Sequence, residues 1–479
     1  MITRIIILSL YALITIIVGI MGMRKTKSFN DFLLGGGKVG AIMTAFSYGT
    51  AYFSAVLFIG FAGKVGWGFG LSGMWIGLFN GLLGVLAVWA ILGWKIKKVS
   101  GEYNISTMSE YLERRYQSPM LKMLASIAIF IFMIPYSAAV FIGLSYLFAS
   151  SFQGLEYWHA VLFMGIFTAI YIVLGGYKSM AVMDTIFGII MTVGVFVMFI
   201  VTINAGEGIN AITSKLHEID PELIKPVGPP GWWPLLSLIV LTSIAPFAMP
   251  QLIIKFIAIR DRKAVNVGMI ASTLFALLIG CIAYYVGSTT RIFLSPEATP
   301  SAFLSDGKPN FDALMPELLN KIMPESMMII ILLLILAASM STLASLVLIS
   351  SSSLTKDFYG GFINKNASDK RLTVLMRIGS AFFVLLSVIL AFLKPDTIVT
   401  ILGLSWGAIG SAFLGPFIWG LFWKKANKTG AYASMFAGLA AVVIFTFTGM
   451  PSPEAGTIGM GVSLAVMPLA SVIRTSARS

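Results

Sequence analysis

The chain has 479 residues, of which 58% are hydrophobic and 11% are charged, and its formal net charge is +13. Soluble domains carry roughly 25% charged residues, so this composition excludes a soluble globular protein and indicates an integral membrane protein. The basic balance is typical of the Lys and Arg excess in cytoplasmic loops, and it does not predict a nucleic-acid partner.

Thirteen apolar segments are long enough to cross a membrane as helices, and they predict an all-α polytopic membrane protein. They cover about residues 4–22, 40–63, 70–94, 121–148, 158–175, 180–204, 233–254, 266–288, 325–350, 373–393, 397–422, 429–449 and 456–474. The first segment is followed by "MRKTK" and lacks a small-x-small cleavage site, so we expect a retained span rather than a secretory signal. The segments between the spans are too short to hold a separate enzyme domain.

The distribution of basic residues predicts an orientation for these spans. With the N-terminus outside and the C-terminus in the cytoplasm, the inside segments hold twenty-five of the 33 Lys and Arg residues. The outside segments hold the other eight, which are Arg4, Lys64, Lys215, Lys225, Arg291, Lys308, Lys321 and Lys394. This pattern fits the positive-inside rule for a plasma (inner) membrane protein, and it leaves no Lys or Arg in the interior of a span.

Ten of the spans form two sets of five, and because five is odd the second set enters the membrane from the opposite side. We therefore predict an inverted repeat, with residues 40–205 as the first half and 233–423 as the second. One extra helix precedes the repeat within residues 1–39, and two follow it within 428–479. The first span of each half is interrupted, by Gly49 in one and by Pro246 and Pro250 in the other, which predicts a midplane binding site.

Small residues also repeat in the third predicted span. Gly73, Gly77 and Gly81 recur at four-residue spacing, so they share one face of a helix. This spacing is typical of a surface where two membrane helices approach closely.

A stripe of hydroxyls runs through the segment "ILAASMSTLASLVLISSSSLT" at residues 335–355. Ala338, Ser341, Thr342 and Ser345 are three or four residues apart, so they share one helix face. A single hydroxyl of this kind usually bonds to a backbone carbonyl or to a neighbouring helix. A cluster has another explanation, because a small hard cation needs several oxygen ligands at once. We therefore predict a sodium site, completed by carbonyls that an unwound stretch near Gly49 would free.

Asp184 is the acidic residue that lies most clearly inside a predicted span, about one turn from its cytoplasmic end. It can cap that helix or pair with Lys178, which is the structural alternative. It can also lie beneath the cation site as an exit ligand or as part of a second site.

The order and spacing of several motifs resemble the sodium/solute symporter family, which includes proline, pantothenate, sialic acid and sugar symporters. The resemblance runs from about residue 28 to 435 and is carried by "FLLGGGKVG", "TAYFSAVLFIG", "EYLERRY", "GGYKSMAVMDT", "PQLIIKFIAIRD", "LAASMSTLASLVLISSSSLTKDFY" and "GSAFLGPFIWGLFWKKANKTGA". It implies a transporter bundle of five plus five helices, with one helix before and two after.

The resemblance also implies particular ligands. The main sodium site would use the carbonyls of Thr50, Phe53 and Ala338 and the hydroxyls of Ser341 and Thr342. A second cation site in some members would match Asp184 and Ser345, but Ala344 stands where a serine is expected.

The solute is less clearly indicated. Tyr52 and Thr242 stand where proline symporters have an aspartate and a tryptophan, which weakens a proline assignment. The candidate pocket residues are polar or aromatic side chains near mid-span, namely Tyr52, Ser54, Asn80, Tyr136, Thr242, Phe247 and Trp406. Without a basic side chain in the spans, we expect a small amino acid, monocarboxylate or similar solute rather than a large acidic sugar.

These observations predict a secondary transporter that couples sodium entry to solute uptake by alternating access. A proton-coupled symporter of the same fold is the nearest alternative, because Asp184 can carry a proton. A cation channel would need a filter motif or a ring of charges, and neither is present in the sequence. A solute sensor would need a signalling domain, which the sequence does not predict.

Overall fold

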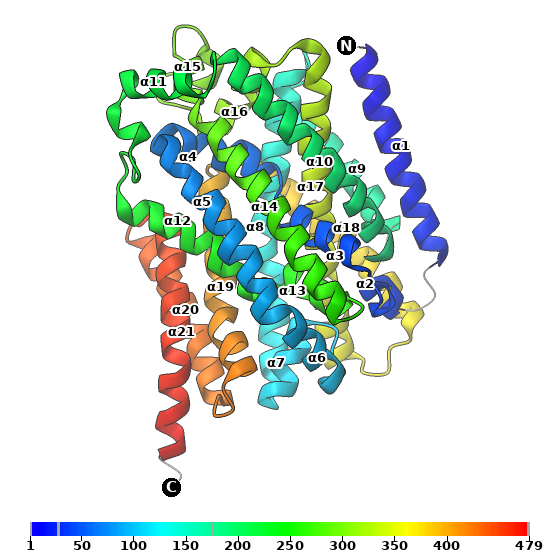
Figure 1. The fold of residues 1–479 in the computed structure, drawn as a ribbon. Coiled ribbons are helices and arrows are strands. Elements are labelled where there is room, and N and C mark those ends of the chain that lie inside the picture. The colour runs from blue at the N-terminus through cyan, green and yellow to red at the C-terminus, as the bar shows by residue number, and fades with distance from the viewer. Residues whose placement is uncertain (1, 26–28, 175–176, 477–479) are drawn as a thin grey trace.

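The computed structural model describes residues 2–25, 29–174 and 177–476, and within these ranges its regular secondary structure is helical. The helices form one bundle, in which the N-terminus lies at the upper end and the C-terminus at the lower end (Figure 1). α1 stands at one edge of this bundle, while α20 and α21 stand at the opposite edge (Figure 1). The all-α fold is therefore as predicted.

The first half of the chain contains eleven α-helices within the described residues. They are α1 (Ile2–Lys25), α2 (Phe29–Leu34), α3 (Ala41–Tyr52), α4 (Ala62–Phe69), α5 (Met74–Phe79), α6 (Trp94–Tyr103), α7 (Met108–Tyr116), α8 (Pro119–Ser151), α9 (Tyr157–Leu174), α10 (Tyr177–Ala205) and α11 (Ile209–Ile219). Wider π-helical turns adjoin three of these helices. η2 (Val56–Phe61) leads into α4, η4 (Asn80–Ala87) follows α5, and η5 (Trp89–Gly93) leads into α6. Short 3₁₀ turns lie at η1 (Gly35–Gly37), η3 (Gly70–Gly73) and η6 (Pro221–Ile224).

The second half has a similar make-up. Its α-helices are α12 (Trp232–Ile244), α13 (Pro250–Ala258), α14 (Arg262–Ser288), α15 (Thr290–Phe293), α16 (Phe311–Ile322), α17 (Glu325–Ser352), α18 (Asp369–Leu393), α19 (Ile398–Phe422), α20 (Lys428–Phe447) and α21 (Ser452–Ser476). The π-helix η9 (Ser353–Ile363) extends α17, and 3₁₀ turns lie at η7 (Ala245–Ala248) and η8 (Pro300–Ala302).

Ten helical segments among the described residues are long and apolar enough to cross a membrane, and the bent pair α12–α13 makes an eleventh. One of the ten, Val56–Tyr103, is 48 residues long, which is more than twice what a bilayer requires. It turns at Gly70, where φ is +57°, and a side chain there would meet the Leu223 carbonyl. A helix covers each predicted span, although span 158–175 ends at a residue outside the described ranges. The count of thirteen and the inverted repeat stay predictions.

Short polar residues begin several of the long helices by accepting a hydrogen bond from a backbone N–H of the first turn. Asp261 accepts from Ala264 at 2.8 Å at the start of α14, and Asn427 accepts from Gly430 at 3.0 Å at the start of α20. At α7 the cap is reciprocal, because Thr107 accepts from the Glu110 amide while the Glu110 carboxylate accepts from the Ser106 amide. α7 and α11 were not among the predicted spans, and both are shorter than a membrane crossing.

Two helices are broken inside the bundle, as their glycine and proline content predicts. α3 stops at Tyr52, residues Phe53 and Ser54 are not helical, and the chain resumes a helical path near Val56. α12 and α13 meet at 43° across η7. Proline explains this second break, because Pro246 and Pro250 lack the N–H that a continuous helix needs.

A parallel β-bridge joins the two broken helices at their outer ends. The Val39 amide donates to the Ala258 carbonyl at 3.1 Å, and the Arg260 amide donates to the Val39 carbonyl at 3.0 Å. The Lys97 ammonium donates to carbonyls on both sides of this bridge, at Gly37 and Ile257. The segment before α3 and the segment after α13 are therefore held together.

α17 is one of the most deeply buried helices of the bundle. In its most apolar 18-residue window 78% of the residues are buried inside the protein, against 17% for α1. Consecutive residues from Leu334 to Ser353 are all buried. Polar side chains on α17 consequently face protein on every side, and each must find a partner there.

Close glycine contacts let α5 and the start of η4 approach α14. A Cβ on Gly77 would lie 2.6 Å from the Gly280 carbonyl carbon, and a Cβ on Gly81 would lie 2.4 Å from the Leu277 side chain. The Gly73 position instead faces Val65. Gly77 and Gly81 therefore form the close-packing face, and Gly73 does not contribute to it.

We expect Gly77→Val to destabilise the protein by about 1–3 kcal/mol, because backbone atoms of α14 block the new side chain. Thermal unfolding of the purified protein in detergent measures this effect. Gly461→Val is the matched control, because a Cβ at Gly461 meets no atom within 4 Å. Equal stability losses in the two variants would contradict the close packing.

A second prediction concerns Asp312 on α16, which lies outside the candidate spans. Its carboxylate accepts from the Ile398 amide at 3.2 Å, at the first residue of α19. Burial raises the pKa of Asp312 from 3.8 to about 7, against the opposing effects of that hydrogen bond and of Lys64. Between these values the folded protein binds more protons than the unfolded chain. The stability contribution of Asp312 therefore falls as the pH rises from 3.8 to about 7.

Asp312→Asn should lose this pH dependence, since asparagine does not ionise and can still accept from the Ile398 amide. Melting temperature measured against pH is the readout. Asp306→Asn is the control, because its side-chain hydrogen bond with Lys308 lowers the pKa of that exposed carboxyl. A pH slope near neutrality that persists in Asp312→Asn would rule out Asp312 as its source.

Candidate functional site

The break in α3 lies against the middle of α17. Because α3 ends at Tyr52, its last carbonyls have no donor from a following helical turn. The Thr342 hydroxyl of α17 lies 3.2 Å from the Thr50 carbonyl oxygen and 3.4 Å from that of Ala51. The predicted unwound stretch and the hydroxyl stripe thus meet at this point.

Two further hydroxyls extend this contact into a buried cluster. The Thr50 hydroxyl lies 2.7 Å from that of Ser341 and 2.7 Å from the Phe46 carbonyl oxygen. Ser341 in turn donates to Asp184 Oδ1 at 2.6 Å. Thr50, Ser341 and Thr342 are each 0% exposed. The structure therefore brings together oxygens from three helices, α3, α10 and α17.

The other two predicted sodium ligands flank this cluster. Ala338 lies one turn before Thr342 on α17, and Phe53 is the first residue after α3. Both are buried. Thr50, Ser341 and Thr342 thus meet at one junction, where neutral oxygens of the backbone and of hydroxyls are screened from solvent. Such oxygens are the ligands that hard cations take.

Asp184 and Ser345 belong to a neighbouring polar cluster that contains a lysine. Lys255 of α13 donates to the Ser47 hydroxyl at 2.8 Å and to the Ser345 hydroxyl at 3.0 Å. Its ammonium lies 3.7 Å from Asp184 Oδ2, which also accepts from Ser47 at 2.5 Å. Lys255 and Asp184 are both 0% exposed. A buried ion pair therefore lies beside the predicted sodium ligands.

The prediction that no Lys or Arg lies inside a span is wrong for Lys255. The predicted span ended at residue 254, but α13 continues to Ala258. Because the proline break redirects this second limb, Lys255 points into the bundle. The signal in the sequence was an apolar run, "LIIKFIA", on both sides of the lysine. Asp184, predicted about one turn inside its span, lies in the third turn of α10. The side chain of Lys178 is outside the described residues.

Six of the seven predicted pocket residues line one cavity. Tyr52, Ser54, Asn80, Tyr136, Thr242 and Trp406 surround it together with aromatic and aliphatic side chains. The cavity has a volume of about 30 Å³, which is room for one or two water molecules. No charged residue lines it among the described part of the chain. A solute the size of an amino acid therefore requires its walls to move apart.

Hydrogen bonds orient the polar groups of this cavity. Thr242 and Ser243 donate to Asn80 Oδ1 at 2.8 Å and 3.0 Å. These contacts fix which end of the Asn80 amide is the acceptor. Tyr52 donates to the Thr242 carbonyl at 2.5 Å, and its ring lies 6.0 Å from that of Trp406. The walls are thus aromatic, and a few fixed polar groups lie between them, as in most small-molecule sites.

Phe247 is not part of this cavity. It lies on η7 and lines an apolar depression with Ile91, Ile244 and Leu414. The 3₁₀ turn that follows Ile244 places Phe247 on a different side of the broken helix from Thr242. Proximity in the sequence to the break was therefore insufficient to predict which side chains face the cavity.

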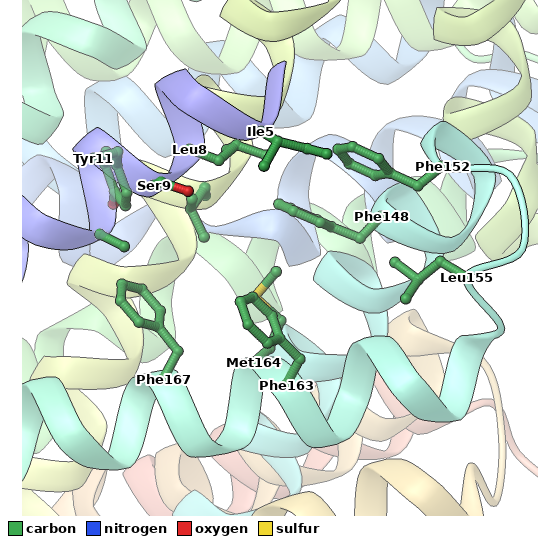
Figure 2. Close-up of a pocket in the computed structure, with 12 residues that line it drawn as sticks. Ile5, Leu8, Ser9, Tyr11, Phe148, Phe152, Leu155, Phe163, Met164 and Phe167 are labelled. Carbon is green, nitrogen blue, oxygen red and sulfur yellow. The ribbon is translucent and has the colours of Figure 1, made fainter. Parts of the chain in front are cut away.

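A larger, apolar cavity lies elsewhere, between α1 and the helices α8, α9 and α17 (Figure 2). Its volume is about 350 Å³. Rings of Phe148, Phe152, Phe163 and Phe167 surround it, and Leu8 of α1 closes one side (Figure 2). Such walls cannot bind an ion or a polar solute, so the small polar cavity is the better functional candidate.

Comparisons with known proteins identify the family of this chain. The family model described as the sodium:solute symporter family matches residues 32–438. The chain is 29% identical over 449 residues to the high-affinity proline transporter PutP of Bacillus subtilis, covering 91% of this chain and 90% of that one. It is also 29% identical over 449 residues to the sodium/pantothenate symporter of Escherichia coli, covering 90% and 89%.

Solved structures share the fold. A Na⁺-coupled sialic acid symporter, in a substrate-bound outward-open state, superimposes with a TM-score of 0.82 at 19% identity, covering 98% of this chain and 97% of that one. A nucleobase-cation-symport-1 family transporter gives a TM-score of 0.53 at 11% identity, covering 93% and 95%. Because the family model spans most of the chain, the protein belongs to the sodium:solute symporter family and is a transporter, not an enzyme.

Proposed function

We propose that this protein takes up a small organic solute together with sodium by alternating access. Family membership implies sodium-coupled solute symport. The observation that carries the finer proposal is the junction of α3 and α17, where freed carbonyls and three hydroxyls converge in a buried place. Symport explains this junction better than a cation channel does, because its three hydroxyls are fully buried, whereas a channel needs polar groups along an open pore.

The sodium ligands in this proposal are the carbonyls of Thr50, Phe53 and Ala338 and the hydroxyls of Ser341 and Thr342. Asp184 supports the site indirectly, because its Oδ1 atom accepts a hydrogen bond from the Ser341 hydroxyl. The Ser341 oxygen then accepts from the Thr50 hydroxyl at 2.7 Å, and a bound cation would take the place of that contact. A cation would also coordinate the Thr50 carbonyl, which receives a hydrogen bond from Thr342 at 3.2 Å.

Sodium at this junction would join α3 to α17 and thereby favour one conformation of the bundle. A ligand shifts such an equilibrium only by its differential affinity, so sodium must bind the outward-open state more tightly. One charge crossing 100 mV yields about 2.3 kcal/mol, and a tenfold sodium gradient adds about 1.4 kcal/mol. Together they support a solute gradient on the order of several hundredfold.

The solute cavity favours a small molecule with at most one carboxylate. Its lining is aromatic and uncharged, and Lys255 is committed to Asp184, Ser47 and Ser345 instead of the cavity. An amino acid or a monocarboxylate fits this chemistry, and proline and pantothenate are the solutes in the names of two relatives. Tyr52, Ser54, Asn80, Tyr136, Thr242 and Trp406 are the proposed contacts.

We also propose that the protein lies in the plasma membrane with its N-terminus outside. The two termini lie at opposite ends of the bundle, as an odd number of spans requires (Figure 1). α6 and α7, which carry several Lys and Arg residues, lie toward the same end as the C-terminus (Figure 1). That end would face the cytoplasm.

Sodium should stabilise the purified protein against thermal unfolding, while potassium should not. A ligand at about ten times its dissociation constant adds about 1.4 kcal/mol. Ser341→Ala and Thr342→Ala should lose this stabilisation because each removes a ligand oxygen. Ser339→Ala is the matched control, since that hydroxyl lies on the same helix but bonds to the Ile335 carbonyl.

The result that contradicts the site is an equal response to sodium and potassium in all four proteins. Uptake that needs no sodium, persists in Ser341→Ala and is lost in Asp184→Asn would favour the proton-coupled alternative. A current that greatly exceeds solute flux would favour a channel.

Asn80→Ala should weaken solute binding about two- to tenfold, the usual effect of losing one neutral hydrogen bond. The sodium-induced rise in melting temperature should stay unchanged, because Asn80 is not a sodium ligand. The measurement is a screen of small amino acids and monocarboxylates for further stabilisation in sodium buffer. Phe247→Leu, which changes the apolar depression instead, should leave the solute response intact. Loss of the response only in Phe247→Leu would place the solute elsewhere.

A further inference from the structure

The ammonium of Lys255 lies in a cage of oxygens. Ser47 and Ser345 accept hydrogen bonds from it at 2.8 Å and 3.0 Å, and Asp184 Oδ2 lies at 3.7 Å. The ring of Tyr177 closes one side, with its centroid 5.1 Å from the nitrogen. These groups come from α3, α10 and α17, while the lysine enters from α13.

This cage has the composition of a cation site. Around Asp184 it offers one carboxylate and the hydroxyls of Ser47, Ser341 and Ser345. A hard monovalent cation takes such ligands. The hydroxyl protons of Ser47 and Ser341 both point to Asp184, so the negative charge is shared over the cage. The Lys255 ammonium occupies the place that a mobile cation would take in such a cage.

We propose that Lys255 is a tethered cation that occupies a second cation position, so that a single sodium ion accompanies each solute. This inference rests on the proposed sodium-coupled function. It assigns to Lys255 a role that a mobile ion would otherwise fill, which is to neutralise Asp184 inside the bundle. Because the ammonium belongs to the chain, its charge is not delivered to the cytoplasm, and the neutralisation costs none of the sodium gradient.

The position of Lys255 on a broken helix makes this arrangement possible. α13 is the second limb of the α12–α13 pair, which bends by 43°, and it packs against both α3 and α17. α3 and α17 also carry the proposed sodium ligands. The tethered cation and the mobile one would therefore neutralise adjacent parts of a single junction, with Asp184 between them.

A purely structural ion pair makes a different prediction. Removing the lysine would then destabilise the protein equally in every salt, because the unpaired carboxylate costs the same free energy in each. If Lys255 is a tethered cation, sodium should instead restore the positive charge that the lysine supplied beside Asp184. The number of sodium ions bound per protein separates these two roles.

The experiment is equilibrium binding of radioactive sodium to the purified full-length protein in potassium buffer. Wild type should bind one sodium ion per chain, while Lys255→Met and Lys255→Gln should bind two. The double variant Asp184→Asn/Lys255→Met should bind one again, because the carboxylate that attracts the second ion is gone. Lys122→Met is the control and should bind one, since it removes a buried lysine that pairs with Glu113 away from this junction.

Each outcome bears on the inference. One sodium ion in both Lys255 variants, or two in wild type, would overturn it while leaving sodium coupling in place. No sodium in wild type would instead overturn the proposed function. If neither Lys255 variant folds in sodium buffer while the double variant does, sodium does not replace the ammonium and the inference fails. The inference is supported if either Lys255 variant binds two sodium ions while wild type, the double variant and Lys122→Met each bind one.

Discussion

The break in α3 is the constraint on which the rest of the site depends. A backbone that leaves the helical path inside an apolar bundle must find new partners for its carbonyls. Thr342 of α17 supplies one such partner, and Thr50 and Ser341 extend the contact. Because α17 is buried along most of its length, these hydroxyls have no water to compete with. The backbone carbonyls that lose their helical donors at the break make it costly, and the same carbonyl oxygens make it suitable for a cation.

Charge inside the bundle follows from this arrangement. Asp184 accepts hydrogen bonds from the Ser341 and Ser47 hydroxyls, and its carboxylate is fully buried. Such a group is tolerated only when a cation lies near it. Lys255 is that cation in the structure, and its reach from α13 links the two broken helices through one polar cluster. The broken helices are therefore coupled twice, by the backbone bridge at Val39 and by this cluster.

The solute cavity is lined partly by residues of the broken helices, whereas the buried charges of Asp184 and Lys255 lie outside its lining. Tyr52 belongs to the last turn of α3 and Thr242 to the last turn of α12, so both broken helices contribute to the lining. A movement of either helix would change the cavity and the sodium junction together. Two ligands that stabilise the same arrangement of these helices bind cooperatively, and this is the physical basis of coupling.

Some parts of this protein follow from the sequence alone. The membrane class, the helical fold and the broken helices follow from apolar length and from proline and glycine, because these act over a few neighbouring residues. The face that Ala338, Ser341, Thr342 and Ser345 share follows from helix periodicity. Six of the seven candidate pocket residues also lie together, since polar side chains near the middle of a span usually face the protein interior and not lipid.

Only the tertiary structure decided the remaining features. Lys255 lies one residue beyond the predicted end of its span, and whether it faced water or the bundle depended on the 43° bend of α12 and α13. Phe247, just before that bend, faces an apolar depression and not the predicted solute cavity. The pairing of Asp184 with Lys255 joins residues 71 positions apart on different helices. Local patterns determine where helices form and break, but the direction of a limb after a break depends on packing against distant parts of the chain.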